Sequence, residues 1–351
     1  MVTALPALRD VMLAKAVDAV PAQDSVPGGL SYEPKWDGFR AVVAIAGGGG
    51  AVELGSRGSK PLTRYFPELV DVFANRLPVS CVLDGEIIVR TGDPGREVLD
   101  WEALSQRIHP AESRIRQLST ATPASFVAFD LLELDGEDLG SRPFGERRAA
   151  LEKLFDTVAA PLHLSQVTRD VELARRWLVE FEGAGLDGVM AKPLDAPYAP
   201  GKRAMLKIKH HRTADVVVLG YRIHKSGSGV GSILLGLWDE GALVNVGGMS
   251  AFSNARRLEL VDELEPLVRR VSHGEIVRAE TERSRFSGSK DLSFVPLEPT
   301  RVVEVRYDQL EGKRFRHSAQ FERWRPDREA ESCTFDQLDV PSAYDLSKVL
   351  T

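Results

Sequence analysis

The chain has 351 residues, of which 43% are hydrophobic and 27% are charged, a composition typical of folded proteins and unlike that of disordered chains. No apolar run approaches the roughly 20 residues that cross a bilayer, and two cysteines cannot form a disulfide framework or a four-cysteine zinc site. The net charge is -6, and neither residues 1–209 nor residues 210–327 form a strongly basic module, so any polyanion must be met by local patches. Because no secretory signal is visible, we expect a cytoplasmic protein without membrane association.

The first 210 residues mix strand and helix patterns without a regular β–α–β alternation. Strands are predicted at 41–45 and 52–54, joined by a hairpin loop of four glycines at 47–50, since glycine tolerates the positive φ angles of tight turns. This mixture predicts the α+β class rather than a doubly wound sheet. Further strands are predicted at 81–89 and 125–132, and helices at 62–77, 146–158 and 171–181.

After Lys209 the pattern changes to short strands separated by glycine-rich turns. Strands are predicted at 216–221, 233–238, 243–246 and 302–307, which suggests a small Greek-key barrel with one helix. That helix is predicted at 253–271, with Ser253 as its N-cap and with Leu258, Val261, Leu264, Leu267 and Val268 on its buried face.

These patterns predict two domains and a tail. The first domain is expected at 1–210 and the second at 211–330, with the boundary near 210–213. The remaining residues, 331–351, are acidic and contain few large apolar side chains, so we expect a loosely held C-terminal tail.

The segment Glu33-Pro-Lys-Trp-Asp-Gly-Phe-Arg40 places a lysine just before a predicted turn. A lysine in an electropositive, partly desolvated pocket loses its proton more easily and becomes a nucleophile. On spacing alone, an exposed surface hairpin is the favoured interpretation of the same eight residues.

The pattern Lys35-x-Asp-Gly-x-Arg40 nevertheless resembles the motif of the covalent nucleotidyltransferases, and further motifs of that superfamily follow in the same order. The whole chain is similar to the small bacterial ATP-dependent DNA ligases, such as ligase C and the ligase module of ligase D. The further motifs are Ser56-Arg57-Gly58, Leu83-Asp84-Gly85-Glu86, Phe126-Val127-Ala128-Phe129-Asp130, Asp187-Gly188-Val189-Met190-Ala191-Lys192, Leu206-Lys207-Ile208-Lys209, Arg316-His317 and Arg323-Trp324-Arg325-Pro326-Asp327-Arg328.

The resemblance implies an adenylation domain of antiparallel sheets and helices, followed by an OB-fold β-barrel domain. It also implies an enzyme that seals nicks in duplex DNA, in DNA repair, through lysyl–AMP and DNA–adenylate intermediates. Lys35 would attack the α-phosphorus of ATP, with Mg²⁺ or Mn²⁺ neutralising phosphoryl charge. We expect a monomer that repair proteins recruit to DNA.

The resemblance further assigns residues to the base and the sugar. Glu33 would accept a hydrogen bond from the adenine amino group, and Phe129 would stack on the base with Met190 or Val189 on the opposite face. Glu86 would bind a ribose hydroxyl or a metal ion, and Arg40 offers a planar fork for ribose or phosphate oxygens. Local pattern alone favours core packing for Phe129, and it is equally compatible with an exposed strand carboxylate for Glu86.

Basic residues would meet the phosphates. Lys207 and Lys209 alternate along a strand pattern and so share a face, although a solvated strand face explains that spacing too. In relatives, the arginine that matches Arg57 faces the 5′-phosphate of the nicked strand. Arg316, Arg323 and Arg325 would orient the departing pyrophosphate.

Asp187 departs from the resembled pattern, because the family usually has glutamate there, acting on the divalent metal. Aspartate is one methylene shorter but remains a hard oxygen ligand, so Asp187 joins Glu86 as a candidate metal ligand. Ser318 is a second departure, at a position where relatives often have proline.

Three alternatives stay open from the sequence. A messenger-RNA-capping guanylyltransferase shares most of the motifs but uses GTP, an RNA ligase shares the lysine chemistry, and a nucleotide- or DNA-binding protein could retain the fold without catalysis. NAD is disfavoured as the adenylate donor, because 34 residues precede Lys35 and the NAD-dependent relatives carry a domain before this lysine and a four-cysteine zinc module.

Overall fold

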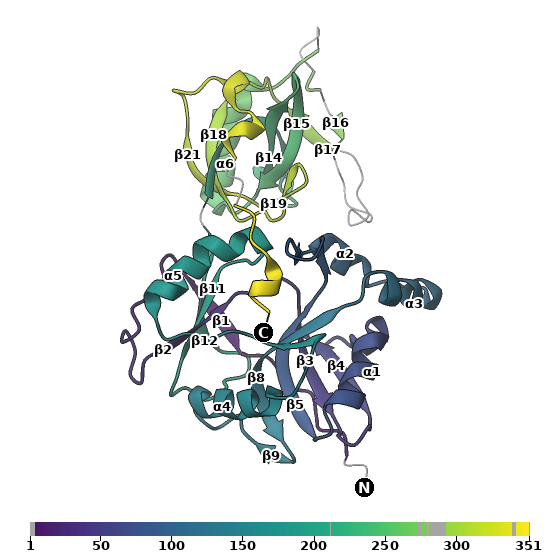
Figure 1. Cartoon of the computed structure of the whole chain (residues 1–351). Helices are drawn as coiled ribbons and strands as arrows, with labels where there is room; N and C mark the ends of the chain where they lie inside the picture. Colours follow the sequence, from purple (N-terminus) through teal and green to yellow (C-terminus); the bar gives the residue numbers. More distant parts are fainter. Residues whose placement is uncertain are drawn as a thin grey trace. The chain divides into compact units, whose positions relative to one another are not determined.

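The computed structural model describes residues 4–210, 212–271, 275–277, 279–280, 293–338 and 342–350 (Figure 1). Contacts divide the chain into two units. The first unit comprises Met1–His210 together with Pro341–Thr351, and the second comprises His211–Val340. His211, at the expected boundary, lies outside the described residues. Within the described part of the chain, every helix is too short or too polar to traverse a bilayer.

The larger sheet of the first unit has the order β10-β8-β5-β3-β4, with β9 added to β8. Its neighbours pair antiparallel except for β10, which runs parallel to β8. The predicted hairpin is confirmed: β3 pairs with β4, and Gly47, Gly48 and Gly49 in the loop have positive φ angles. The strands are β3 (Phe39–Ile45), β4 (Val52–Ser56), β5 (Cys81–Ile88), β8 (Ser125–Leu134), β9 (Glu137–Asp138) and β10 (Leu162–Leu164).

A smaller sheet has the order β1-β12-β11-β2. Its strands are β1 (Leu13–Val17), β2 (Leu30–Pro34), β11 (Val189–Pro193) and β12 (Arg203–Ile208). One face is buried against α5 (Val171–Glu180), through a cluster that includes Val189, Ile208 and Trp177. The register places Met190 between Glu33 and Lys207 on neighbouring strands, so these three side chains share the other face.

Helices cover the sheets of the first unit. Phe66, Leu69, Phe73 and Leu77 are buried at the spacing predicted for one helix face, although the first turn is a separate 3-10 segment (η1, Thr63–Tyr65). Two short helices that the sequence analysis did not predict, α2 and α3, follow the β6–β7 hairpin. The elements are α1 (Pro67–Arg76), β6 (Arg90–Thr91), β7 (Val98–Leu99), α2 (Trp101–Gln106), α3 (Glu112–Ala121), α4 (Phe144–Phe155), α5 (Val171–Glu180) and η2 (Phe181–Ala184).

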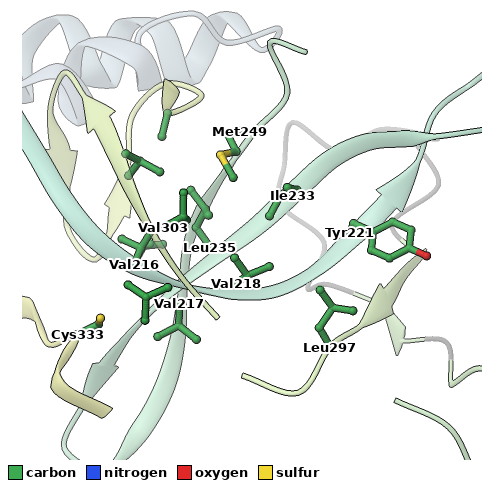
Figure 2. Close-up of a cluster of buried hydrophobic side chains, with 14 of the residues drawn as sticks. Val216, Val217, Val218, Tyr221, Ile233, Leu235, Met249, Leu297, Val303 and Cys333 are labelled. Carbon is green, nitrogen blue, oxygen red and sulfur yellow. The ribbon is translucent and has the colours of Figure 1, made fainter. Parts of the chain in front are cut away.

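The second unit is a curled sheet that forms the OB-fold domain expected from the sequence. β15, β14, β13, β18 and β21 follow one another as antiparallel neighbours, and a bridge between Met249 and Ala319 links the end of β15 to the residue before β21. Figure 2 shows Val216, Val218, Leu235 and their neighbours packed inside the curl. The main elements are β13 (Arg212–Ile223), β14 (Val230–Asp239), β15 (Ala242–Met249), α6 (Asn254–Leu264), β18 (Val302–Tyr307) and β21 (Gln320–Trp324).

Shorter elements complete the second unit and the C-terminal segment. The short strands are β16 (Ala279–Glu280), β17 (Ser293–Pro296), β19 (Leu310–Glu311) and β20 (Arg314–Phe315), and the 3-10 segments are η3 (Glu265–Leu267), η4 (Ala330–Ser332), η5 (Phe335–Gln337) and η6 (Leu346–Lys348).

The helix predicted at 253–271 is corrected in length and in face. The Ser253 cap is confirmed, because its hydroxyl accepts a hydrogen bond from the backbone N–H of Arg256 at 3.2 Å. The α-helix ends at Leu264 and a 3-10 turn containing Pro266 follows, since proline cannot donate to a continuing helix. Leu258 is 56% exposed, whereas Leu260 and Leu264, one turn apart, are buried.

The prediction of a loosely held tail is wrong for residues 342–350. Leu346 and Val349 are fully buried in the first unit's core, and Tyr344 packs on Phe181 with ring centroids 5.2 Å apart. The Leu346 N–H also donates to the Glu97 carbonyl at 2.8 Å. A few well-spaced apolar side chains therefore suffice to anchor an otherwise acidic segment. Residues 339–341 and Thr351 lie outside the described residues.

Candidate active site

The loop that contains Asp187 and Gly188 holds the backbone of Lys35 in place. Lys35 directly follows β2, and its N–H donates to the Gly188 carbonyl at 2.8 Å, while the Asp187 N–H donates to the Lys35 carbonyl at 2.9 Å. Gly188 has a φ of +135°, and a Cβ there would lie 2.0 Å from the Ile208 carbonyl oxygen. Glycine is therefore required at this position, and the loop fixes where Lys35 begins.

Asp187 is shared by two lysines. Its Oδ2 lies 2.5 Å from Lys35 Nζ and 3.1 Å from Lys209 Nζ, and all three side chains are partly buried. Burial works to raise the pKa of Asp187, but the charges of Lys35 and Lys209 outweigh it and bring that pKa below its usual value. Asp187 is thus an ionised carboxylate that positions the ammonium groups of both lysines.

Cations outnumber this carboxylate. Burial lowers the pKa of Lys207, and the positive charges of Lys209, Lys35 and Arg57 lower it further. These mutual effects place the four basic side chains near one another, although Arg57 itself is exposed. An excess of positive charge in a partly desolvated site favours a polyanion such as a chain of phosphates.

Glu33 lies deep beside this cluster and is 1% exposed. Its Oε2 lies 2.9 Å from Lys192 Nζ, but Oε1 is buried without a hydrogen-bond partner. Burial raises the pKa of Glu33, while the charges of Lys192 and Arg148 act in the opposite direction. A buried acceptor without a donor is costly, so the site is suited to a ligand that supplies an amino group.

Phe129 is set by a bulge in β8. Gly85 of β5 pairs with Ala128 and Asp84 pairs with Asp130, which leaves Phe129 as the extra residue. Lys192 Nζ lies 4.7 Å from the centre of the Phe129 ring and donates to its backbone carbonyl at 3.1 Å. The partly buried ring therefore lies next to the Glu33–Lys192 pair rather than in the continuous sheet core.

Arg40 is held by a buried carboxylate that the sequence analysis did not select. Two Arg40 nitrogens donate to Asp84 at 3.0 and 2.7 Å, and the Tyr198 hydroxyl donates to the same carboxylate at 2.6 Å. The Arg40 guanidinium also lies 5.5 Å from the Phe129 ring centre. Asp84 stands two residues before Glu86 in the same strand motif, which is the signal that could have identified it.

Glu86 faces the loop that carries Lys35. Its Oε1 accepts the Gly38 N–H at 3.1 Å, and its strand position pairs with Arg40. Burial raises the pKa of Glu86 to about 8 despite the opposing charges of Lys35 and Arg40. At neutral pH the carboxyl group is therefore largely protonated, and it can serve both as a donor and as an acceptor for a sugar hydroxyl.

The selected arginines of the second unit are bound to acidic residues of that unit. Arg325 Nη1 donates to both Asp215 oxygens at 2.9 Å, and Arg325 Nη2 donates to Asp327 at 2.9 Å. Arg316 Nη1 donates to the Gln309 side chain at 3.1 Å, and its Nε lies 3.2 Å from Glu311 Oε1. These arginines must exchange partners before they can bind a phosphate.

Sequence reasoning missed Lys192 and Arg148 as site residues. Lys192 closes the motif that begins at Asp187, and its alternation with Met190 along β11 was the available signal. Nothing in the linear pattern distinguished Arg148 from the other charged residues of α4. Among the described residues, no group of three or more His, Cys, Asp or Glu side chains is placed to hold a metal ion.

Comparisons with known proteins identify DNA ligases as relatives of both units of the chain. A family model described as ATP dependent DNA ligase domain matches residues 11–209, and one described as ATP dependent DNA ligase C terminal region matches residues 226–328. DNA ligase C2 of Mycolicibacterium smegmatis is 53% identical over 353 residues, which cover 96% of each chain. DNA ligase C of Mycobacterium tuberculosis is 54% identical over 355 residues, which cover 97% of this chain and 96% of that protein.

A solved structure from a study of Lig E DNA ligases supports the fold. It aligns over 91% of this chain and 100% of its own, with a TM-score of 0.56. Because the sequence identity is 17%, this likeness concerns the fold alone.

Proposed function

The chain belongs to the ATP-dependent DNA ligase family and is a DNA ligase that uses ATP, and from this premise we propose that Lys35 is the side chain that becomes adenylated. One observation carries the proposal. Lys35 Nζ is held 2.5 Å from Asp187, beside Lys207 and Lys209, at the centre of the surplus positive charge. A nucleophile placed among the cations that bind phosphates meets the α-phosphorus without reorganisation.

In the first step Lys35 loses a proton to solvent and its amine attacks the α-phosphorus. A nitrogen–phosphorus bond forms, the bond between the α-phosphorus and the bridging oxygen breaks, and pyrophosphate leaves. Lys207 and Lys209 would neutralise the phosphate oxygens, while Asp187 keeps Lys35 in line. Arg316 and Arg325 would orient pyrophosphate after leaving Glu311 and Asp215.

The base would occupy the space next to Glu33. Glu33 Oε1 would accept the adenine amino group, which satisfies the buried acceptor. Phe129 and Met190 would enclose the ring, since both lie next to the Glu33–Lys192 pair. Glu86 and Arg40, adjacent across β5 and β3, would bind the ribose.

In the later steps the adenylate passes from Lys35 to DNA. A 5′-phosphate oxygen at a nick would attack the Lys35-bound phosphorus, and Lys35 would leave as an amine. Arg57, exposed at the edge of the cluster, would hold that 5′-phosphate. The 3′-hydroxyl then attacks the activated phosphate and AMP departs. Nicked duplex DNA would be held mainly through its backbone, so sealing should depend little on sequence and weaken with salt.

Mg²⁺ or Mn²⁺ would supply charge neutralisation at the phosphoryl oxygens. Asp187, and Glu86 once it has released its proton, would offer carboxylate oxygens of the kind these ions prefer, but two carboxylates leave most positions to phosphate oxygens and water. We also propose that the enzyme acts as a monomer and that repair proteins recruit it to nicks. The guanylyltransferase, RNA-ligase and non-enzymatic alternatives are not favoured, because the relatives are DNA ligases.

A nucleotide-transfer experiment tests the proposal. The full chain is incubated with ATP and magnesium, digested and mapped by mass spectrometry, and sealing of a singly nicked duplex is followed in parallel. We expect an AMP adduct on Lys35, loss of adduct and sealing with a chelator, and recovery with magnesium or manganese. An adduct on another residue, or labelling by GTP but not ATP, contradicts the assignment.

A further inference from the structure

Tyr198 has a buried hydroxyl whose hydrogen bonds reach the candidate site. The side chain is 7% exposed, and its hydroxyl donates to Asp84 Oδ2 at 2.6 Å while it accepts the backbone N–H of Met12 at 3.0 Å. Burial and the charge of Asp84 raise the pKa of Tyr198, so the hydroxyl keeps its proton and remains a donor. Tyr198 lies outside the motifs selected from the sequence, and the proposed function gives it no role.

The loop that carries Tyr198 is fixed by its backbone. The Tyr198 N–H donates to the Gly140 carbonyl at 2.8 Å. Two residues earlier, the Ala196 carbonyl accepts from the Phe144 N–H at 2.9 Å and from Arg147 Nη1 at 3.2 Å. The Arg147 guanidinium also lies 5.6 Å from the centre of the Tyr198 ring. The Tyr198 hydroxyl is therefore held in a defined place by the protein itself.

The carboxylate of Asp84 binds one particular edge of Arg40. Arg40 Nε donates to Asp84 Oδ1 at 3.0 Å, and Arg40 Nη2 donates to Asp84 Oδ2 at 2.7 Å. Asp84 thus occupies the side of the guanidinium that carries Nε. The remaining edge, formed by Nη1 and the second N–H of Nη2, is the one that can donate to oxygen atoms of a ligand. The orientation of the Asp84 carboxylate therefore sets the direction of this edge.

Tyr198 contributes to that orientation. Asp84 is fully buried, and its Oδ2 accepts from both Arg40 and Tyr198. A buried carboxylate is stable only when donors satisfy its oxygens, and a hydroxyl supplies a donor without adding a second charge. If the hydroxyl is removed, Arg40 alone holds Oδ2, and the two side chains can turn together. Arg40 would then keep its ion pair and lose its fixed direction.

We propose that Tyr198 is a positioning residue for the sugar of the nucleotide, because through Asp84 it directs the remaining edge of Arg40 toward the ribose hydroxyls. The proposal rests on the proposed function, which places the ribose next to Arg40 and Glu86. These two residues pair across β3 and β5, so the Arg40 edge and the Glu86 carboxyl group would meet the same sugar. Tyr198 itself would touch neither the nucleotide nor DNA.

The test compares ATP with 2′,3′-dideoxy-ATP, which lacks both ribose hydroxyls. The rate of adduct formation on the full chain is measured as kcat/KM for wild type, Y198F and Y32F. We expect the preference for ATP to fall about three- to tenfold in Y198F, the size expected for one weakened hydrogen bond. Y32F is the matched control and should keep the wild-type preference. It also removes a buried tyrosine hydroxyl, but one that donates to the Pro21 carbonyl at 2.7 Å rather than to Asp84.

Two further variants separate positioning from general structural damage. In an R40Q background Y198F should change the preference for ATP no further, because both substitutions act through one contact. D84N keeps the shape of the carboxylate without its charge, and it should lower the preference at least as much as Y198F. Thermal unfolding of each variant shows that the rates refer to folded protein.

The outcomes distinguish this proposal from the proposed function. Y198F should leave the rate with dideoxy-ATP nearly unchanged, because that nucleotide offers Arg40 no hydroxyl. Equal losses with both nucleotides, an undiminished Y198F effect in R40Q, or an unchanged preference in D84N would overturn the proposal. Absence of any adduct in wild type, or equal wild-type rates with the two nucleotides, would instead contradict the proposed function.

Discussion

The first unit's site and the second unit's arginines balance charge in opposite ways. In the first unit a single carboxylate, Asp187, serves both Lys35 and Lys209. In the second unit a single arginine, Arg325, is bonded to two carboxylates, Asp215 and Asp327. The first arrangement leaves positive charge in excess in a partly buried place, and the second leaves none.

This difference separates a preorganised site from an exchangeable one. Fixed cations in a desolvated site need no rearrangement when phosphates arrive, which is the arrangement that stabilises a transferring phosphoryl group. Arg325 instead starts in ion pairs with Asp215 and Asp327, so a phosphate must replace a carboxylate before this arginine can contribute. We infer that the first unit supplies the fixed chemistry and the second supplies contacts that form and break during the reaction.

The largest effect is expected when the proposed nucleophile, Lys35, is removed from the preorganised site. K35A should abolish the AMP adduct, a loss on the order of 10³-fold or more, because no other amine replaces a positioned nucleophile. Labelling with ATP and thermal unfolding check this together. K153A, which removes an exposed lysine from α4, is the control and should label normally. Comparable labelling of K35A would refute the role of Lys35.

The next largest effect should come from the C-terminal segment, which returns to the first unit. L346A opens a cavity in that unit's core and should destabilise it by about 2–5 kcal/mol, whereas V179A at a 71% exposed site should be neutral. Chemical denaturation measures both.

G183A tests the same contact from the other side. A Cβ on Gly183 would lie 1.8 Å from the Ser342 carbonyl oxygen, so the segment must shift. Hydrogen exchange in 342–350 should then increase while exchange in β14 stays unchanged. An equal increase in hydrogen exchange in both units would show that the two units do not open independently.

A smaller effect is expected for Arg325. R325A should slow adduct formation from ATP about 10- to 100-fold, because one cation that orients pyrophosphate is lost. Sealing of a nick that already carries AMP should fall much less, since no pyrophosphate leaves in that step. Single-turnover kinetics on both substrates separate the two, with R314A at an exposed position as the control. Equal losses in both steps would place Arg325 elsewhere in the reaction.

The smallest effect concerns a surface pair of the second unit. The hydrogen bond from Arg256 holds the pKa of Glu263 below its usual value, and Trp324 Nε1 also donates to Glu263 at 3.1 Å. A lowered carboxyl pKa stabilises the fold above the unfolded-state pKa, and this contribution disappears as pH falls through the folded-state pKa.

E263Q should therefore be less stable than wild type by at most about 1 kcal/mol near neutral pH, and the difference should shrink as pH falls below the unfolded-state pKa of about 4.3. Thermal unfolding across that range measures it. E259Q, which removes a more exposed partner of Arg256, should have a smaller effect. If the stability difference between E263Q and wild type increases as pH falls, the expected direction of the pH dependence is wrong.

The local pattern of residues determined much of this protein. Alternating and helical apolar spacing predicted the β3–β4 hairpin, the face of α1 and the Ser253 cap, because these features depend on neighbours within a few residues. The ordered motifs also identified the family and selected Lys35, Asp187 and Lys209. The structure brings these three together, with the Nζ atoms of Lys35 and Lys209 at 2.5 and 3.1 Å from Asp187 Oδ2.

The tertiary structure decided what depends on distant residues. The face of α6 follows from which side the barrel covers, so Leu260 is buried and Leu258 is exposed. The C-terminal segment is anchored because Leu346 packs among apolar side chains of the first unit that lie far earlier in the chain. Burial by residues that are distant in the sequence also raises the pKa values of Glu86 and Glu33. Desolvation depends on all the atoms around a group, and no linear pattern of residues contains that information.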